Sequence, residues 1–407
     1  MRELSPTILL LHMNREQLTV HGSRFTVALV MWAILSGPSS CKDTSQTKEA
    51  VHTHCMREAF LPVKYAKGFK VDYYNGFKVI TVTDWKDTSK IFAQYVLLPK
   101  GKPAPVDFKY AVLLDLPLRK VICVSTNHLS EMVRLGLEDS VAGVANVALI
   151  YNQELVEKVK QNKIADIGKD ELNYERMVEL NPSFVFSSGN WDGGDKMKNK
   201  LNSLHIKSVL NLDYMEQEPL ARAEWLKFVA AFYNLEPEAD SIFQQIEKDF
   251  LALKEKAKTV SKKPTVFANI PFKEIWYMPC GENYMAKMIA DAGGEFLWKE
   301  AKATNGLNLN LDYEAVYSRA ADADVWLCNS FASSLADIKA ADKKNTFFKA
   351  YKSKNVFNYD KRNTSNGGFD FWESGALSPD KILADLISIF HPELLPNHEL
   401  YYYRKLK

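Results

Sequence analysis

The sequence predicts an α/β protein of two lobes, each with a mostly parallel sheet flanked by helices, joined by a long helical connector. Three observations predict this class. Short apolar runs alternate with amphipathic helical segments in both halves of the chain. Residues 219–260, between the halves, have helical periodicity without a strand-like run. Residues 173–178 and 312–317 repeat one pattern, in which an Asn or Asp precedes a Tyr-Glu pair and a helical segment.

Length and composition agree with two folded domains. The chain has 407 residues, of which 46% are hydrophobic and 12% aromatic, and a chain of this length can bury two separate cores. Its 52 Lys and Arg residues nearly balance 50 Asp and Glu residues. Because no large excess of positive charge is present, nucleic acid is not an expected partner.

The N-terminus has the pattern of an export signal. Basic residues precede an apolar run at residues 25–35, which is too short to span a bilayer, and small residues then lead to Cys41. Residues 36–41 resemble a bacterial lipobox, in which the cysteine is acylated and begins the mature chain. Pro38 departs from that pattern, so an unmodified thiol beside a conventional cleavage site is the alternative. We expect a signal peptide at residues 1–40, a lipid-anchored tether at 41–60, and an exported, periplasmic or cell-surface protein.

The N-terminal lobe is expected at residues 61–218. Strand-like runs at 69–82 and 91–98, with a turn signal at 74–76, predict an antiparallel β meander at its start. Strands at 121–125, 141–144, 184–187 and 207–210 then alternate with helical segments. This alternation is typical of a parallel sheet covered by helices.

The helical connector is expected at residues 219–262 and the C-terminal lobe at 263–407. The connector holds two helical segments, and the longer one could extend about 30 Å at 1.5 Å per residue; the alternative is one more surface helix of the second lobe. In the C-terminal lobe, alternation resumes with strands at 264–269, 324–329 and 355–358 and ends with a helix at 379–390. The tyrosine-rich tail at 399–407 is expected to be ordered and to pack on a lobe.

The repeated Tyr-Glu segments place Glu175 and Glu314 in equivalent positions. Asn and Asp are good helix N-caps, and a Glu in the first turn is stabilised by the free amides and the positive end of the helix dipole. Both residues are therefore expected at exposed helix starts, one on each lobe. They are either two attachment points for a partner or ordinary first-turn acids.

Several segments resemble one protein family when they are taken in order. They are residues 121–127 with Glu131 and 135–136, 173–178 with 180–186, 292–295, and 371–373 with 378–380. Over residues 121–392 the chain is similar to the helical-backbone class of periplasmic substrate-binding proteins, which serve ABC importers of cobalamin, ferric siderophores and haem. The opening β meander and the C-terminal tail are not explained by this resemblance.

The resemblance implies a mode of action and a set of partners. In that family one Glu on each lobe pairs with arginines of the membrane permease, and Glu175 and Glu314 lie in the matching motifs. Carboxylates suit this role because they form bidentate, charge-assisted bonds with Arg. We therefore expect an ABC importer permease, a small-molecule metal chelate and a membrane reached through a lipid anchor as partners. The protein itself is expected to be a monomer.

The ligand of such a protein lies in a cleft between the lobes, against loops at the carboxyl ends of strands. The expected ligand-binding residues are Asn127, His128, Trp191, Trp276, Tyr277, Arg362, Asp370 and Trp372. Flat aromatic side chains in loops suit a bulky organic ligand. The alternative for the aromatic residues is packing in the core, and for His128 a hydrogen bond to nearby backbone.

The ligand is expected to bring its own metal. The histidines that follow the signal do not form a three-ligand group with obvious spacing, so neither a bare-metal site nor a cofactor is expected. The candidate loops contain few cations, mainly Lys273 and Arg362. This favours a corrinoid or a weakly charged chelate over a strongly anionic catecholate complex, while cobalamin, ferric siderophores and haem all stay open.

The function expected from the sequence is capture and delivery without chemistry. The chain contains no GxSxG, HExxH or GxxxxGK[ST] motif, so it is not expected to be an enzyme. The two alternatives are an exported hydrolase and a surface lipoprotein that scavenges ligand without an ABC permease.

Overall fold

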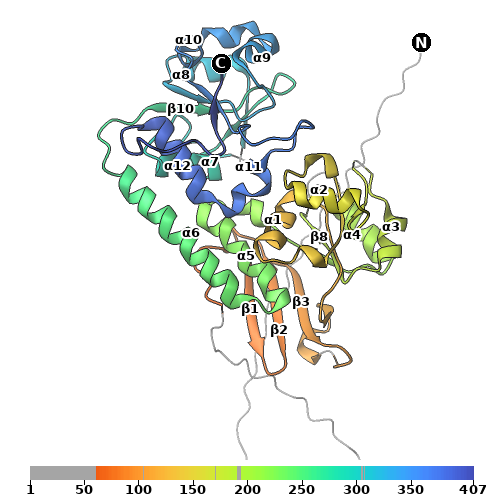
Figure 1. Cartoon of the computed structure of the whole chain (residues 1–407). Coiled ribbons are helices and arrows are strands. Elements are labelled where there is room, and N and C mark those ends of the chain that lie inside the picture. Colours follow the sequence, from red (N-terminus) through yellow and green to blue (C-terminus); the bar gives the residue numbers. More distant parts are fainter. Residues whose placement is uncertain (1–60, 104, 170, 190–193, 304–305, 307) are drawn as a thin grey trace, which may run out of the picture. The chain divides into compact units, whose positions relative to one another are not determined.

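The computed structural model describes residues 61–407 except 104, 170, 190–193, 304–305 and 307 (Figure 1). The expected signal peptide, the tether with Cys41, and Trp191 therefore lie outside the described residues. Among the helices that are described, none combines the length and the apolar character needed to span a bilayer. The described chain forms two α/β lobes, a pair of helices between them in sequence, and an additional N-terminal sheet. The two-lobed α/β class predicted from the sequence is confirmed.

The N-terminal sheet has four strands in the order β1-β2-β3-β4. β1 (Phe69–Tyr74), β2 (Phe77–Thr83) and β3 (Ile91–Pro99) form an antiparallel meander, as the sequence predicts. β4 (Val112–Leu116), for which the sequence analysis makes no prediction, pairs with β3 in parallel. The connection at residues 100–111 contains a 3₁₀ turn and returns the chain to Tyr95 in the middle of β3, so that β4 runs in the same direction as β3.

The first lobe is built on a five-stranded sheet with the order β7-β6-β5-β8-β9, and all of its pairs are parallel. The strands are β5 (Val121–Cys123), β6 (Val141–Val144), β7 (Ala165–Asp166), β8 (Phe184–Ser187) and β9 (Ser208–Leu210). The helices are α1 (Thr126–Arg134), α2 (Gln153–Lys160), α3 (Tyr174–Leu180) and α4 (Gly194–Ser203). Alternate side chains of the strands enter different cores: Val121 and Phe186 pack with α1, whereas Ile122 and Val185 pack with α3.

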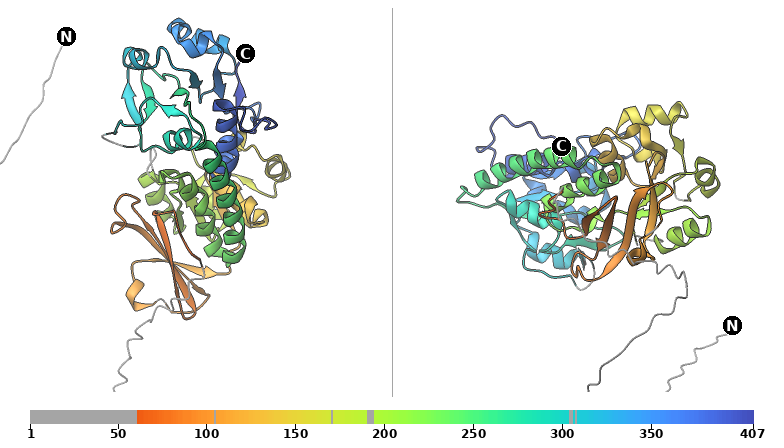
Figure 2. Two further views of the ribbon diagram at one scale, coloured as in Figure 1. Left: turned by 90° about the vertical axis from the view of Figure 1, so that its left-hand side faces the viewer. Right: turned by 90° about the horizontal axis from the view of Figure 1, so that it is seen from below.

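Two helices, α5 (Pro219–Tyr233) and α6 (Glu236–Ala257), connect the first lobe to the second in the sequence. They pack side by side (Figure 2). Together they contribute buried side chains to the cores of both lobes. Trp225 and Phe228 of α5 pack with Phe69 of β1 in the core of the first lobe. Phe243 and Phe250 of α6 are buried in the core of the second lobe. Because the helix pair contributes apolar area to both cores, it is more than a surface helix of one lobe.

The second lobe repeats the architecture with a sheet in the order β12-β10-β14-β15-β16. Its strands are β10 (Thr265–Ala268), β12 (Glu295–Phe296), β14 (Val325–Leu327), β15 (Val356–Asn358) and the antiparallel edge strand β16 (Arg404–Lys405). Its helices are α7 (Tyr284–Asp291), α8 (Tyr313–Ala320), α9 (Leu335–Ala341), α10 (Lys349–Lys352), α11 (Asp370–Glu373) and α12 (Pro379–Phe390). A separate two-stranded antiparallel sheet pairs β11 (Trp276–Pro279) with β13 (Asn308–Leu311). The end of the segment at 270–279, expected as a loop, is thus a strand.

The C-terminal tail is held by one buried carboxylate. Asp385 of α12 is fully buried and accepts hydrogen bonds from the backbone amides of Tyr401, Tyr402 and Tyr403, at 2.7, 2.7 and 2.9 Å, and from His398 Nε2 at 2.7 Å. Tyr402 and Tyr403 are fully buried in the core of the second lobe. The prediction of an ordered tail packed on a lobe is confirmed.

Candidate functional site: the ligand cleft and the lobe junction

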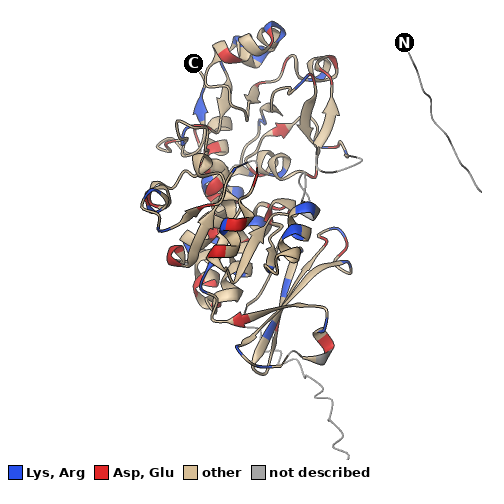
Figure 3. Cartoon of the chain, turned by 90° about the vertical axis from the view of Figure 1, so that its right-hand side faces the viewer, with Lys and Arg blue, Asp and Glu red and all other residues tan. Residues whose placement is uncertain are grey.

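A cavity of about 980 Å³ lies at the carboxyl ends of β10, β14 and β15 of the second lobe and faces residues 214–215 of the first lobe. From the first lobe and α5 it is lined by Tyr214, Met215 and Arg222. From the second lobe it is lined by Asn269, Ile270, Tyr277, Pro279, Asn283, Tyr284, Met285, Gly306, Asn308, Asn310, Asn329, Tyr359, Phe371 and Trp372, and from the β2–β3 loop by Asp84, Trp85 and Lys86. We call this cavity the cleft. Figure 3 shows that Lys and Arg residues and Asp and Glu residues are mixed over the described chain and do not form a face of one sign.

The second lobe contributes a row of polar groups because three parallel strands end at one edge. Asn269 follows β10, Asn329 follows β14 and Tyr359 follows β15. Asn269 and Asn329 have φ of 64° and 44°, a left-handed conformation that Asn tolerates better than most residues. Asn269 Nδ2 donates to the carbonyl of Tyr277 at 2.6 Å, which fixes β11 against this edge. Among the residues that the structure describes, five asparagines line the cleft: Asn269, Asn283, Asn308, Asn310 and Asn329.

Arg222 is the cation that the fold holds most firmly in the cleft. Its Nε and one Nη donate to the carbonyls of Glu216 and Tyr214, at 3.0 and 2.7 Å, and the guanidinium lies 4.2 Å from the ring centre of Tyr284. Burial lowers the pKa of Arg222, and the nearby Asp213 and Glu216 oppose that shift. The Tyr284 hydroxyl is buried and has no hydrogen-bond partner in the described part of the chain. An arginine fixed by carbonyls beside an unpaired hydroxyl can bind a single acceptor group of a ligand.

Aromatic side chains supply the apolar wall of the cleft. Trp372 is half exposed, Tyr277 is 39% exposed, and Trp85 is partly buried. Trp372 Nε1 donates to the Tyr359 hydroxyl at 3.2 Å, so its indole is oriented. Sequence reasoning missed Trp85. A tryptophan among charged residues in the short loop between two predicted strands was the signal that could have identified it.

The structure separates the ligand-binding residues expected from the sequence. Tyr277 and Trp372 line the cleft. Asn127 does not line it: its Nδ2 donates to Asp213 Oδ2 at 3.2 Å and so supports the segment that carries Tyr214. Arg362 and Asp370 line a different cavity, described below.

Two of the expected ligand-binding residues are core residues, and those predictions are wrong. Trp276 is fully buried, its Nε1 donates to the carbonyl of Ala268 at 2.8 Å, and its ring packs with Phe267 and Trp326. His128 is 1% exposed, and burial lowers its pKa to about 3, so its ring is neutral and cannot reach a ligand.

The lobes meet at α11 and the loop before it. Glu373 Oε2 and Oε1 accept hydrogen bonds from the backbone amides of Tyr151 and Asn152, at 2.6 and 2.9 Å, just before α2. Burial raises the pKa of Glu373 to about 7 although both amides stabilise the carboxylate. Gly368 lies against the same segment: a Cβ on it would be 2.4 Å from the carbonyl oxygen of Leu149. The second lobe therefore packs closely on residues 148–152 of the first.

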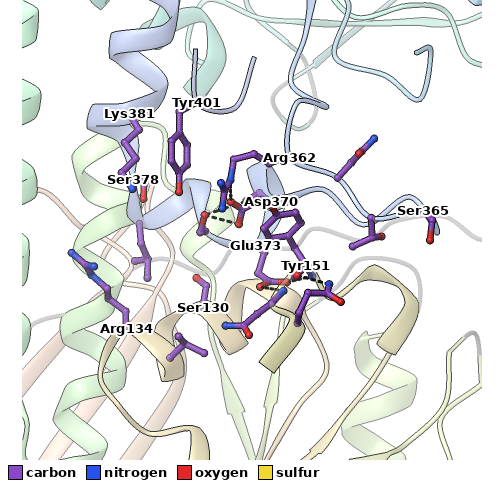
Figure 4. Close-up of a pocket in the computed structure, with 17 residues that line it drawn as sticks. Ser130, Arg134, Tyr151, Arg362, Ser365, Asp370, Glu373, Ser378, Lys381 and Tyr401 are labelled. Carbon is purple, nitrogen blue, oxygen red and sulfur yellow. Dashed lines mark hydrogen bonds and ion pairs between the residues drawn. The ribbon is translucent and has the colours of Figure 1, made fainter. Parts of the chain in front are cut away.

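A second cavity of about 700 Å³ opens beside this junction, and we call it the junction cavity (Figure 4). It is lined by Ser130, Val133, Arg134, Tyr151, Asn152, Gln153, Arg362, Asn363, Thr364, Ser365, Asp370, Glu373, Ser374, Leu377, Ser378, Lys381 and Tyr401. It shares no lining residue with the cleft. Between the two, α11 presents Trp372 to the cleft and Asp370 and Glu373 to the junction cavity.

The two repeated helix starts are formed as their sequences suggest. Asn173 Oδ1 accepts from the Arg176 amide at 2.9 Å, and Asp312 Oδ1 accepts from the Ala315 amide at 2.7 Å. Glu175 and Glu314 follow these caps and are exposed. Glu314 forms an ion pair with Lys344 at 3.2 Å. Both carboxylates are thus accessible in the first turns of α3 and α8.

Comparison with known proteins decides the family. The model of the periplasmic binding protein family matches residues 121–363, which is more than half of the chain. This protein belongs to the periplasmic binding protein family. An uncharacterized lipoprotein of Methanocaldococcus jannaschii is 30% identical over 365 residues, which cover 84% of this chain and 85% of that protein.

Solved structures agree with the family at the level of the fold. A periplasmic binding protein from Veillonella parvula superimposes with a TM-score of 0.53 and 15% identity, over 68% of this chain and 92% of that one. An ABC transporter substrate-binding protein from Listeria monocytogenes gives a TM-score of 0.51 and 16% identity, over 68% and 99%. The predicted resemblance to the helical-backbone class of binding proteins is confirmed. In the described residues, no three His, Cys, Asp or Glu side chains form a metal-binding group.

Proposed function

We propose that this protein is an extracytoplasmic solute-binding lipoprotein that captures a metal chelate of the iron-siderophore or cobalamin type in the cleft and delivers it to the permease of an ABC importer. It performs no chemistry on its ligand. The observation that supports this most directly is the lining of the cleft, where partly exposed aromatic rings and the neutral amides of the second lobe surround a volume of about 980 Å³. The family match and a lipoprotein relative support the extracytoplasmic setting.

The size and lining of the cleft suit a bulky, amide-rich ligand. Pockets for small molecules have volumes of about 300–1,000 Å³, so the cleft is near the upper end of that range. Trp85, Tyr277 and Trp372 offer flat apolar surfaces. Each asparagine amide both donates and accepts hydrogen bonds without carrying charge. A corrinoid or a hydroxamate chelate, with amide or hydroxamate groups around a rigid centre, complements such a wall.

The charged side chains of the cleft indicate which kind of chelate it can bind. Among the described residues its cationic side chains are Arg222 and Lys86, and the same loop carries Asp84, which pairs with Lys90. A catecholate complex with several negative charges would leave most of them without a charged partner when it is desolvated. The cleft therefore favours a neutral or weakly anionic chelate, with Arg222 and the Tyr284 hydroxyl binding one acceptor group.

A binding titration tests the proposal. The mature protein is titrated with cobalamin, a ferric hydroxamate, a ferric catecholate and haem, and binding is measured by quenching of tryptophan fluorescence. We expect a weakly charged chelate to bind with Kd below about 10 μM, a free energy of about −7 kcal/mol. If none of the four chelates reaches this affinity, the proposal is wrong.

Two matched variants test whether the chelate binds in the cleft. Trp372→Ala removes a half-exposed ring from the cleft and should weaken chelate binding at least tenfold, measured by calorimetry. Phe331→Ala removes a ring that is 81% exposed and lies outside the cleft, so it should leave the affinity unchanged. Equal losses in both variants would place the chelate elsewhere.

A further inference from the structure

The junction cavity contains cations that have no role in the cleft. Arg134 of α1 and Lys381 of α12 are exposed, and within the described residues neither forms an ion pair with a carboxylate. Arg362 also lines the cavity; its Nε donates to Asp370 Oδ2 at 2.5 Å, while its two terminal nitrogens have no hydrogen-bond partner in the described part of the chain. Three cations from different segments thus line one cavity of about 700 Å³.

Aromatic rings hold two of these cations close to one another. The guanidinium of Arg362 lies 4.4 Å from the ring centre of Tyr401 and 5.0 Å from that of Tyr151, and Lys381 Nζ lies 4.3 Å from the Tyr401 ring. Figure 4 shows the Tyr401 ring between the side chains of Lys381 and Arg362. The face of an aromatic ring attracts each cation, but it does not remove their mutual repulsion. An anion placed between Arg362 and Lys381 would offset this repulsion.

The carboxylates of the cavity already have other partners. Asp370 accepts from Arg362 and, at 2.7 Å, from the hydroxyl of Ser374. Glu373 accepts from the backbone amides of Tyr151 and Asn152. Because these acids bind other donors, they leave Arg134 and Lys381 available to a ligand.

Two serines add neutral donors to the same cavity. Ser130 is 9% exposed, and its buried hydroxyl has no hydrogen-bond partner in the described part of the chain. Ser378 precedes α12, a helix of 12 residues; its side chain forms no cap hydrogen bond but does form a hydrogen bond with the Tyr402 side chain. A buried hydroxyl without a partner costs free energy unless a ligand or water satisfies it.

We propose that the junction cavity is a second binding site, for a small soluble anion that carries two or more carboxylate or phosphate charges. Arg134, Arg362 and Lys381 bind the charged groups, and the serine hydroxyls donate to their oxygens. Three cations favour a multivalent anion over a monovalent one because each additional negative charge gains another close pairing. Since the cations come from both lobes, a bound anion also contacts both sides of the junction.

Calorimetry with defined anions tests this site. The full mature protein is titrated with citrate, inorganic phosphate and acetate at one ionic strength. We expect binding of citrate or phosphate and at least tenfold weaker binding of acetate. The double variant Arg134→Gln/Lys381→Gln should weaken binding of the multivalent anion at least tenfold. The control variant Lys256→Gln/Lys339→Gln removes the same charge from exposed positions outside both cavities. It should bind the multivalent anion with the affinity of the wild type.

The remaining outcomes overturn the proposal. They are equal affinity in both double variants, no binding of citrate or phosphate at millimolar concentration, and binding only to vesicles of phosphatidylglycerol, which would mean a membrane surface in place of a soluble anion. Circular dichroism and thermal melts establish that each variant is folded, as expected for changes at exposed side chains. Chelate affinity should be the same in both double variants, so failure of the anion site can be distinguished from failure of the cleft.

Discussion

Glu373 shows how one carboxylate can make the packing of the lobes sensitive to pH. It is 4% exposed, and it accepts the two amides that precede α2 from the opposite lobe. Burial raises its pKa from 4.5 to about 7 in the folded protein. A carboxyl whose pKa is raised by folding contributes its full stability below the unfolded pKa and loses it as the pH rises through the folded pKa. The relevant window is therefore between about pH 4.5 and pH 7.

The prediction for Glu373 concerns the slope of stability with pH. The shift corresponds to about 3 kcal/mol, so the free energy of unfolding of the wild type should contain a contribution that falls by roughly this amount from pH 4.5 to pH 7. Glu373→Gln does not titrate and should lack this contribution, whereas Glu300→Gln, at an exposed site, should retain it. Denaturant titrations at several pH values measure it. Parallel pH profiles for Glu373→Gln and the wild type would contradict the assignment.

Neighbouring residues show what sequence could and could not predict about the site. The sequence placed Trp276 and Tyr277 together in a loop, whereas β11 is a strand in which Trp276 is buried and Tyr277 is 39% exposed. Strand side chains alternate between two faces, so one of such a pair must point inward. A strand of four residues paired with a distant segment has too little local pattern to be identified in advance.

Among the elements, those with strong local signals were predicted best. The expected bounds of α12, 379–390, agree with the structure because Pro379 begins the helix and Pro392 follows its end. The strand β4 was not predicted, and its parallel pairing with β3 depends on the path of a connection and not on the pattern of the strand itself. The junction cavity was not predicted because Arg134, Arg362 and Lys381 are far apart in sequence and only packing of the lobes brings them together.

The C-terminal tail gives a prediction for Asp385. An Asn at this position would keep one acceptor oxygen but direct an NH₂ group toward backbone amides that also donate. Asp385→Asn should therefore lower the free energy of unfolding by about 3 kcal/mol. Chemical denaturation measures this, with the exposed Asp322→Asn as the control. A loss no larger than that of the control would mean that the tail does not depend on the carboxylate.

At the scale of the whole molecule, the two exposed first-turn glutamates give a prediction for docking. If Glu175 and Glu314 pair with arginines of the permease, the double variant Glu175→Arg/Glu314→Arg should reduce chelate uptake at least tenfold, because like charges then face each other. Chelate affinity should stay within twofold, since neither residue lines the cleft. Chelate uptake is measured in cells or proteoliposomes, and chelate affinity is measured by calorimetry.

Glu238→Arg is the matched control for docking. Glu238 is also an exposed acid in the first turn of a helix, so its reversal loses the same favourable interaction with the helix dipole. Uptake should be unchanged in this variant. Normal uptake by the Glu175 and Glu314 double variant, or an equal loss with Glu238→Arg, would count against docking through these residues.

The helix α11 contributes side chains to the walls of both cavities. Its four residues present Trp372 to the cleft and Asp370 and Glu373 to the junction cavity. A ligand that moves this helix on one side therefore alters the wall of the other. By thermodynamic reciprocity, if an anion changes the affinity for the chelate by some factor, the chelate changes the affinity for the anion by the same factor. Under the proposed function, release of the chelate would then depend on the ionic composition of the surroundings as well as on the permease.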